Sequence, residues 1–78
     1  MKKVYKFIYQ GHGNILETVV IHGDLVDTYF SDINLFSAHK VPRHVFRKDT
    51  CTWQELGWSC LKDYIARLKE LHFKEVIL

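Results

Sequence analysis

Residues 39–48 hold the side chains best suited by type to bind or process an anion. The stretch contains four cations, two histidines and no acidic residue: His39, Lys40, Arg43, His44, Arg47 and Lys48. Residues 1–38 and 49–78 each carry a net charge of −1, so the net charge of +2 arises from this stretch. An arginine guanidinium can donate two parallel hydrogen bonds to a carboxylate or a phosphate. The stretch therefore predicts contact with an acidic protein surface or with a nucleic-acid backbone.

A second interpretation of residues 39–48 is a solvated loop whose charges make no specific contact. The sequence pI of 8.6 lies below the value of about 9 that dedicated nucleic-acid-binding domains exceed. Both interpretations remain open at the level of sequence.

Four side chains have the chemistry of zinc ligands: His39, His44, Cys51 and Cys60. They are spaced by five, seven and nine residues, whereas structural zinc sites take their ligands in close pairs from tight turns. The sequence therefore predicts no metal site, and no motif indicates another cofactor.

A metal-independent ribonuclease is a third option. It would use His39 and His44 for proton transfer, Arg43 and Arg47 for the charge on phosphorus, and an acid such as Asp49. Nothing in the spacing requires this arrangement, so we predict no catalytic residues.

The first half of the chain has the two-residue alternation of β-strands. In residues 3–10, Tyr5, Phe7 and Tyr9 point to one face. Turn residues at 11–14 and 23–24 separate this strand from strands over residues 15–22 and 25–30. These three strands predict an antiparallel meander. Residues 31–37 fit either a short helical turn or an extended piece, and residues 38–50 predict a loop with a short strand near Val45 and Phe46.

The second half predicts one long amphipathic helix over residues 52–71. Thr52 and Glu55 have the spacing of a capping box. Apolar residues share one side of the helix at 100° per residue: Trp53, Gly57, Leu61, Tyr64, Ile65, Leu68 and Leu71. A glycine in that stripe predicts close approach of the helix to the sheet or to a partner. His72 is suited to a left-handed helix end, and residues 73–78 predict a last strand.

The predicted fold is a single α+β domain over residues 1–78: a three-stranded meander, one helix layered on it and a C-terminal strand. A single helix covers only one face of such a sheet. The aromatic face formed by Tyr5, Phe7 and Tyr9 is therefore a candidate contact surface, unless residues 31–48 fold over it.

Other features narrow the function classes. No run approaches the roughly 18 apolar residues of a membrane span. Cys51 and Cys60 are poorly placed for a disulfide, which favours a reducing compartment, by default the cytoplasm.

We therefore expect a small non-enzymatic regulatory or inhibitory protein that forms a homodimer and binds another protein, with a protein associated with nucleic acid as one option for that partner. The basic loop 39–48 and the aromatic sheet face would make the contacts. Direct binding of RNA or DNA is the alternative, and the ribonuclease is third.

Overall fold

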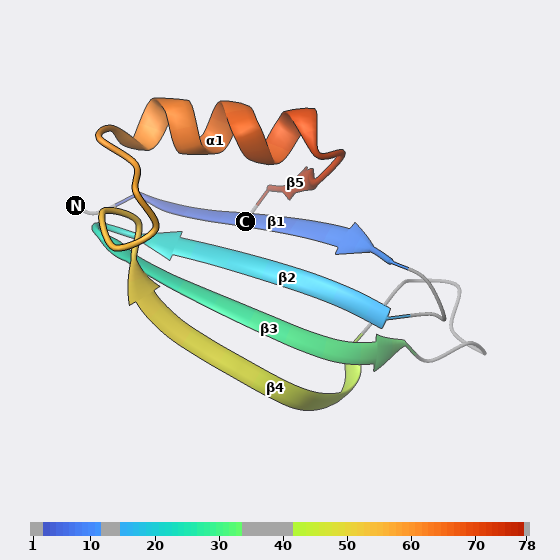
Figure 1. The fold of residues 1–78 in the computed structure, drawn as a ribbon. Helices are drawn as coiled ribbons and strands as arrows, with labels where there is room; N and C mark the ends of the chain where they lie inside the picture. The colour runs from blue at the N-terminus through green and yellow to red at the C-terminus, as the bar shows by residue number, and fades with distance from the viewer. Residues whose placement is uncertain (1–2, 12–14, 34–41, 78) are drawn as a thin grey trace.

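The protein is a five-stranded antiparallel sheet with one helix. The computed structural model describes residues 3–11, 15–33 and 42–77, and only the backbone of residues 33 and 42–44. The elements in chain order are β1 (Val4–Gln10), β2 (Ile15–His22), β3 (Leu25–Ile33), β4 (Pro42–Thr52), α1 (Leu61–Glu70) and β5 (Lys74–Val76). The strand order is β4-β3-β2-β1-β5 (Figure 1). The predicted α+β class, with a meander, a helix and a C-terminal strand, is confirmed.

Strand register divides the sheet side chains between two faces. Residues that are opposite one another on neighbouring strands project to the same side. Phe7 is paired with Val19, and in the next row Ile21 is paired with Val26. These four side chains are almost completely buried and form one core cluster with helix residues. Helix α1 therefore covers the face that carries Phe7 (Figure 1).

The helix contributes two buried side chains to this core, Tyr64 and Leu68. The Tyr64 ring stacks on Trp58, with 5.7 Å between the ring centroids. Burial raises the pKa of Tyr64 to about 12, as expected for a phenol removed from water. Trp53 ties the segment before the helix to the β2–β3 turn, since its indole donates to the Gly23 carbonyl at 3.2 Å.

The predicted helix over residues 52–71 is wrong in its first half. The capping box forms, because the Thr52 hydroxyl accepts from the Glu55 amide and the Glu55 carboxylate accepts from the Thr52 amide. It starts only a single turn, however. Gly57 ends that turn with φ of 95°, and the Gly57 and Trp58 amides donate back to the Gln54 and Trp53 carbonyls. These two bonds form the glycine-dependent helix stop known as a Schellman motif.

The role of Gly57 is therefore to allow a left-handed backbone conformation, and not to make room for a neighbouring element. A Cβ atom built on it meets no atom within 4 Å, so the predicted approach to the sheet is wrong. The prediction for the other end of the helix is confirmed: His72 is left-handed with φ of 71°. The amides of His72 and Phe73 donate to the carbonyls of Lys69 and Leu68.

The predicted loop over residues 38–50 is wrong where the structure describes it, except that the short strand predicted near Val45 and Phe46 is present as part of a longer strand. Residues 42–52 form β4, an edge strand paired with β3. Phe30 is opposite Arg47, but the next residue of β3, Ser31, is opposite Val45. Phe46 therefore has no opposite residue and forms a β-bulge. The side chains of β4 from residue 45 to 50 are all exposed, so no apolar alternation marks this strand in the sequence. Residues 31–33, which the sequence left as either a helical turn or an extended piece, are extended and belong to β3. Residues 34–41 lie outside the described residues.

Substitution of the two helix leucines should have unequal effects. Leu68 is 4% exposed and Leu61 is only partly buried. Leu68→Ala should lower the free energy of unfolding by about 2–5 kcal/mol, and Leu61→Ala by less than about 2 kcal/mol. Urea denaturation followed by tryptophan fluorescence measures both; equal losses would contradict this placement of the helix.

Gly57→Ala should cost about 1 kcal/mol, because an alanine is strained at positive φ. Gly11→Ala is the matched control: its Cβ would meet only ordinary contacts at 3.7 and 3.9 Å, and its φ is not left-handed. The same denaturation measurement compares them. A neutral Gly57→Ala would mean that the turn at residues 53–57 is not closed by a left-handed residue.

Candidate functional site

The β4 strand is the long open edge of the sheet. In the described structure it pairs with β3 on one side only, over 11 residues. Because strand side chains alternate, its two described cations lie on opposite faces. Arg47 is opposite Phe30, on the same side of the sheet as α1. Lys48 is opposite Tyr29, on the other side. The edge thus presents positive charge to both sides of its backbone.

Each cation lies over the aromatic ring of its cross-strand partner. The Arg47 guanidinium carbon is 5.3 Å from the Phe30 ring centroid, and the Lys48 Nζ atom is 5.3 Å from that of Tyr29. Such cation–π contacts contribute about 0.5–1 kcal/mol at exposed sites. They hold the two long side chains near the sheet while their charged groups remain in solvent.

Asp49, on the same strand, forms an ion pair with Arg47. Its Oδ2 atom accepts a hydrogen bond from Arg47 Nε at 3.0 Å. Both side chains are more than half exposed, at 66% for Arg47 and 54% for Asp49. An ion pair this exposed contributes little free energy, so an external carboxylate can compete for the guanidinium.

The other predicted members of the basic stretch are only partly placed. His39 and Lys40 lie outside the described residues. Arg43 and His44 belong to β4 by backbone, and their side chains also lie outside the description.

The predicted aromatic contact face is wrong at its centre. Phe7 is 0% exposed and lies in the core under α1. Tyr5 packs against the same core with Lys3 Nζ 4.9 Å from its ring centroid. Tyr9 is 38% exposed and its ring centroid lies 5.3 Å from that of Phe73. The helix covers this face because it is the more apolar of the two. It leaves the opposite face uncovered, although Leu16 and Ser31 on that face are each only 1% exposed.

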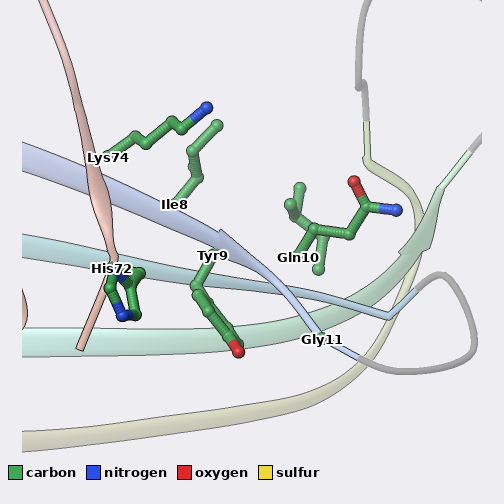
Figure 2. Close-up of a pocket in the computed structure, with 7 residues that line it drawn as sticks. Ile8, Tyr9, Gln10, Gly11, His72 and Lys74 are labelled. Carbon is green, nitrogen blue, oxygen red and sulfur yellow. The ribbon is translucent and has the colours of Figure 1, made fainter.

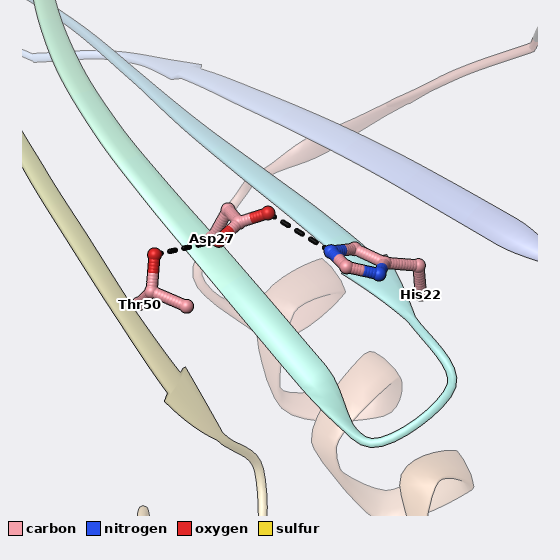
Figure 3. A network of polar contacts seen from close by, with 3 residues as sticks. All are labelled: His22, Asp27 and Thr50. Atoms are coloured by element: carbon pink, nitrogen blue, oxygen red, sulfur yellow. Dashed lines mark hydrogen bonds and ion pairs between the residues drawn. The ribbon is translucent and has the colours of Figure 1, made fainter.

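A polar network on the uncovered face links three strands (Figure 3). Asp27 of β3 accepts from Thr50 Oγ1 of β4 at 2.7 Å and contacts His22 Nε2 of β2 at 2.9 Å. The hydrogen bonds from His22 and Thr50 lower the pKa of Asp27. The Thr50 hydroxyl hydrogen-bonds the Asp27 carboxylate and not the His22 imidazole, so these residues do not form a pair of nucleophile and general base. They clamp β2, β3 and β4 together. No motif in the sequence signalled it, because strand register brings the three residues together.

Hollows occur at several places on the described surface. The hollow in Figure 2, about 440 Å³, lies at the end of β1 and includes Tyr9, Gln10, His72 and Lys74. Figure 2 shows Lys74 on the opposite side of β1 from Tyr9, so these polar groups do not converge on one ligand. A second, about 500 Å³, lies beside α1 and is lined by Leu61 and Ile65 among others.

The third hollow is smaller, at about 170 Å³, and lies on the uncovered face of the sheet. Ser31 lines it and is 1% exposed. Its hydroxyl has no hydrogen-bond partner among the described residues, and an unpaired buried group of this kind costs about 1–3 kcal/mol.

Other site types find no support in the described residues. No three His, Cys, Asp or Glu side chains there are grouped so that they could hold a metal ion. Within the same residues, α1 is too short and too polar to cross a membrane. Cys51 and Cys60 are both free thiols.

Asp27→Asn should weaken the clamp by about 1 kcal/mol at neutral pH. A carboxyl group whose pKa is lowered by folding stabilises the fold above its unfolded pKa of about 3.9, and that stabilisation is lost as the pH falls through the folded value. The variant should therefore lose less stability than the wild type between about pH 5 and pH 2.

Urea denaturation across that pH range measures the effect. Asp24→Asn is the control, since Asp24 makes no side-chain hydrogen bond with a described residue. Parallel pH curves for the wild type and Asp27→Asn would contradict the role of the carboxylate.

Comparison with known proteins gives one partial match. No protein-family model matches the chain, and no solved structure matches it. Phytanoyl-CoA dioxygenase 1 of Oryza sativa subsp. japonica is 36% identical over 42 residues, which are 54% of this chain and 15% of that protein. The chain thus spans a small part of the length of this curated relative, and the match does not establish a family.

Proposed function

We propose that this protein is a non-enzymatic binding module that takes up an extended, acidic segment of another protein along β4. The observation that carries the proposal is the edge itself: an 11-residue strand, paired on one side only among the described residues, with Arg47 and Lys48 on its two faces. The occupied edge would regulate or inhibit the partner by holding that segment.

The backbone of an edge strand supplies the affinity. Its outward N–H and C=O groups can pair with an added strand, and alternate side chains then decide which strand is accepted. Proline, charged side chains and a bulge are the usual devices that protect such edges from indiscriminate pairing and aggregation. β4 has all three, with Pro42 at its start and the bulge at Phe46.

The charges then select the partner. A strand with glutamates or aspartates on both faces would attract Arg47 and Lys48, whereas a basic strand would be repelled. A second copy of β4 would bring cations close to cations. The proposed homodimer would therefore form elsewhere on the molecule, and sedimentation velocity at micromolar concentration tests it. A cytoplasmic location remains part of the proposal.

Direct nucleic-acid binding is less well supported. Single-stranded binders stack bases on exposed aromatic rings. Here Arg47 and Lys48 already lie over the rings of Phe30 and Tyr29, and a base would have to displace them. The ribonuclease has less support again, because the carboxylate of Asp49 is already hydrogen-bonded to Arg47. The dioxygenase match covers too little of that protein to carry its activity to this chain.

The test uses a ten-residue peptide of alternating Glu-Glu and Thr-Thr pairs, which places glutamates on both faces of an extended strand. Its Lys-Lys counterpart and a fifteen-nucleotide oligo-dT serve as comparison probes. We expect the acidic peptide to shift the backbone amides of β4 in ¹H–¹⁵N spectra, and we expect salt to weaken its binding.

Arg47→Gln with Lys48→Gln should raise the Kd of the acidic peptide about five- to tenfold, since each exposed ion pair contributes about 0.2–1 kcal/mol. Lys62→Gln with Lys69→Gln, on the exposed side of α1, is the control of equal charge and should leave the Kd unchanged. Amide shifts away from β4, or equal losses in both double variants, would contradict the proposal. Binding of oligo-dT alone would make the nucleic-acid alternative correct.

A further inference from the structure

We infer that Glu17 and the aromatic rings on its two sides form a binding site for a methylated ammonium group. Glu17 belongs to a cross-strand row on the side of the sheet that α1 packs against. Tyr9 of β1 and Phe30 of β3 are the residues directly opposite it. The row continues to Arg47 of β4, opposite Phe30, and to the ring of Phe73 beside that of Tyr9. Because opposite residues project to the same side of a sheet, one carboxylate lies between two aromatic side chains.

The outer face of each flanking ring is already occupied, which leaves the face toward Glu17. The Arg47 guanidinium carbon lies over the Phe30 ring, 5.3 Å from its centroid, and comes from the β4 side. The Phe73 ring is tilted by 33° to the Tyr9 ring at 5.3 Å between centroids. Phe73 directly precedes β5, which lies on the side of β1 away from β2. Both rings therefore turn their second face toward β2.

The spacing of the strands suits a cation held between these two rings. Neighbouring strands lie about 4.8 Å apart, so a small cation above Glu17 would be about that far from each ring. A cation within about 6 Å of a ring centroid is attracted by the negative face of the ring. The carboxylate below would supply the opposite charge.

Glu17 has no cationic partner of its own among the described residues. Its side chain is partly buried and makes no hydrogen bond or ion pair with them. Burial raises the pKa of Glu17, as expected for a carboxylate that loses water and gains no partner. Arg47, two strands away in the same row, instead donates to Asp49 at 3.0 Å. Since Glu17 keeps part of its surface in solvent, an external cation can reach it.

The two rings decide which kind of cation is favoured. A metal ion such as Ca²⁺ takes six or more oxygen ligands, and the described residues contain no group of acidic, His or Cys side chains that could hold one. A methylated ammonium spreads its charge over a weakly hydrated, apolar surface, and aromatic rings are the usual protein groups that recognise it. The row therefore fits the trimethylammonium group of a small molecule or of a methylated lysine.

Three probes test this inference: tetramethylammonium, its neutral isostere tert-butanol, and the ammonium ion. Titration into the ¹⁵N-labelled protein at constant ionic strength should give a Kd on the order of 10 mM for tetramethylammonium, as expected for five non-hydrogen atoms. The other two probes should bind at least about fivefold more weakly, because one lacks the charge and the other the apolar surface. The shifted amides should belong to Tyr9, Glu17, Phe30 and their chain neighbours.

Two variants separate the carboxylate from the ring. Glu17→Gln and Phe30→Leu should each weaken tetramethylammonium binding about three- to fivefold. Glu17→Gln should also remove the preference over tert-butanol, without lowering the melting temperature, because it removes a partly buried, unpaired charge. Glu75→Gln is the matched control: Glu75 is on the same side of the sheet, opposite Phe7, but its carboxylate already contacts Lys69 Nζ at 4.0 Å.

Choline and an acetylated, amidated Nε-trimethyllysine distinguish the two sources of the group. A lower Kd for choline indicates a small-molecule ligand, and a lower Kd for the lysine derivative indicates a modified protein.

Equal affinity for tetramethylammonium and tert-butanol, shifts that map away from the row, or equal losses in Glu17→Gln and Glu75→Gln would overturn the inference. So would the absence of shifts at about 100 mM tetramethylammonium, roughly tenfold above the expected Kd. These readouts do not involve the acidic peptide, so they are independent of the binding proposed for the edge of β4.

Discussion

The fold depends on one constraint: a single short helix must bury the more apolar face of a five-stranded sheet. A helix is about 10–12 Å across and strands are spaced by about 4.8 Å, so α1 covers only two or three strands. It covers the region where Phe7, Ile21 and Val26 become fully buried. Tyr64 and Leu68 are the helix side chains that bury them. Among the described residues, β4 contributes only Cys51 to the edge of this core, and α1 does not cover the opposite face.

This division explains where the candidate sites lie. Away from the helix, the outer strands are joined by backbone pairing, by the clamp of His22, Asp27 and Thr50, and by cations stacked on aromatic rings. Polar interactions of this kind leave side chains in solvent, so the same residues that hold β4 to β3 remain available to a partner. The hollow beside Ser31 lies on the face that α1 does not cover.

Sequence patterns predicted the parts of this structure that depend on local chemistry. The alternation of Tyr5, Phe7 and Tyr9 marked β1, the Thr52–Glu55 spacing marked a real capping box, and His72 marked the helix end. The errors arose where local patterns are ambiguous. Gly57 fits a helix stripe as well as a stop, and only its positive φ distinguishes them. The side chains of β4 from residue 45 to 50 are all exposed, so its charged residues resembled a loop. The hollow and the clamp arise from register, which no local pattern encodes.

The most direct test of this structure is hydrogen exchange at single amides of β4, measured by NMR on the free protein. If β4 is an ordered strand with one open edge, its amides should alternate along the strand outside the bulge at Phe46. Those that donate to β3 should be protected and those that point outward should exchange rapidly. Uniformly rapid exchange from Val45 to Cys51 would mean that this segment is a loop. The contact surface proposed here would then not exist.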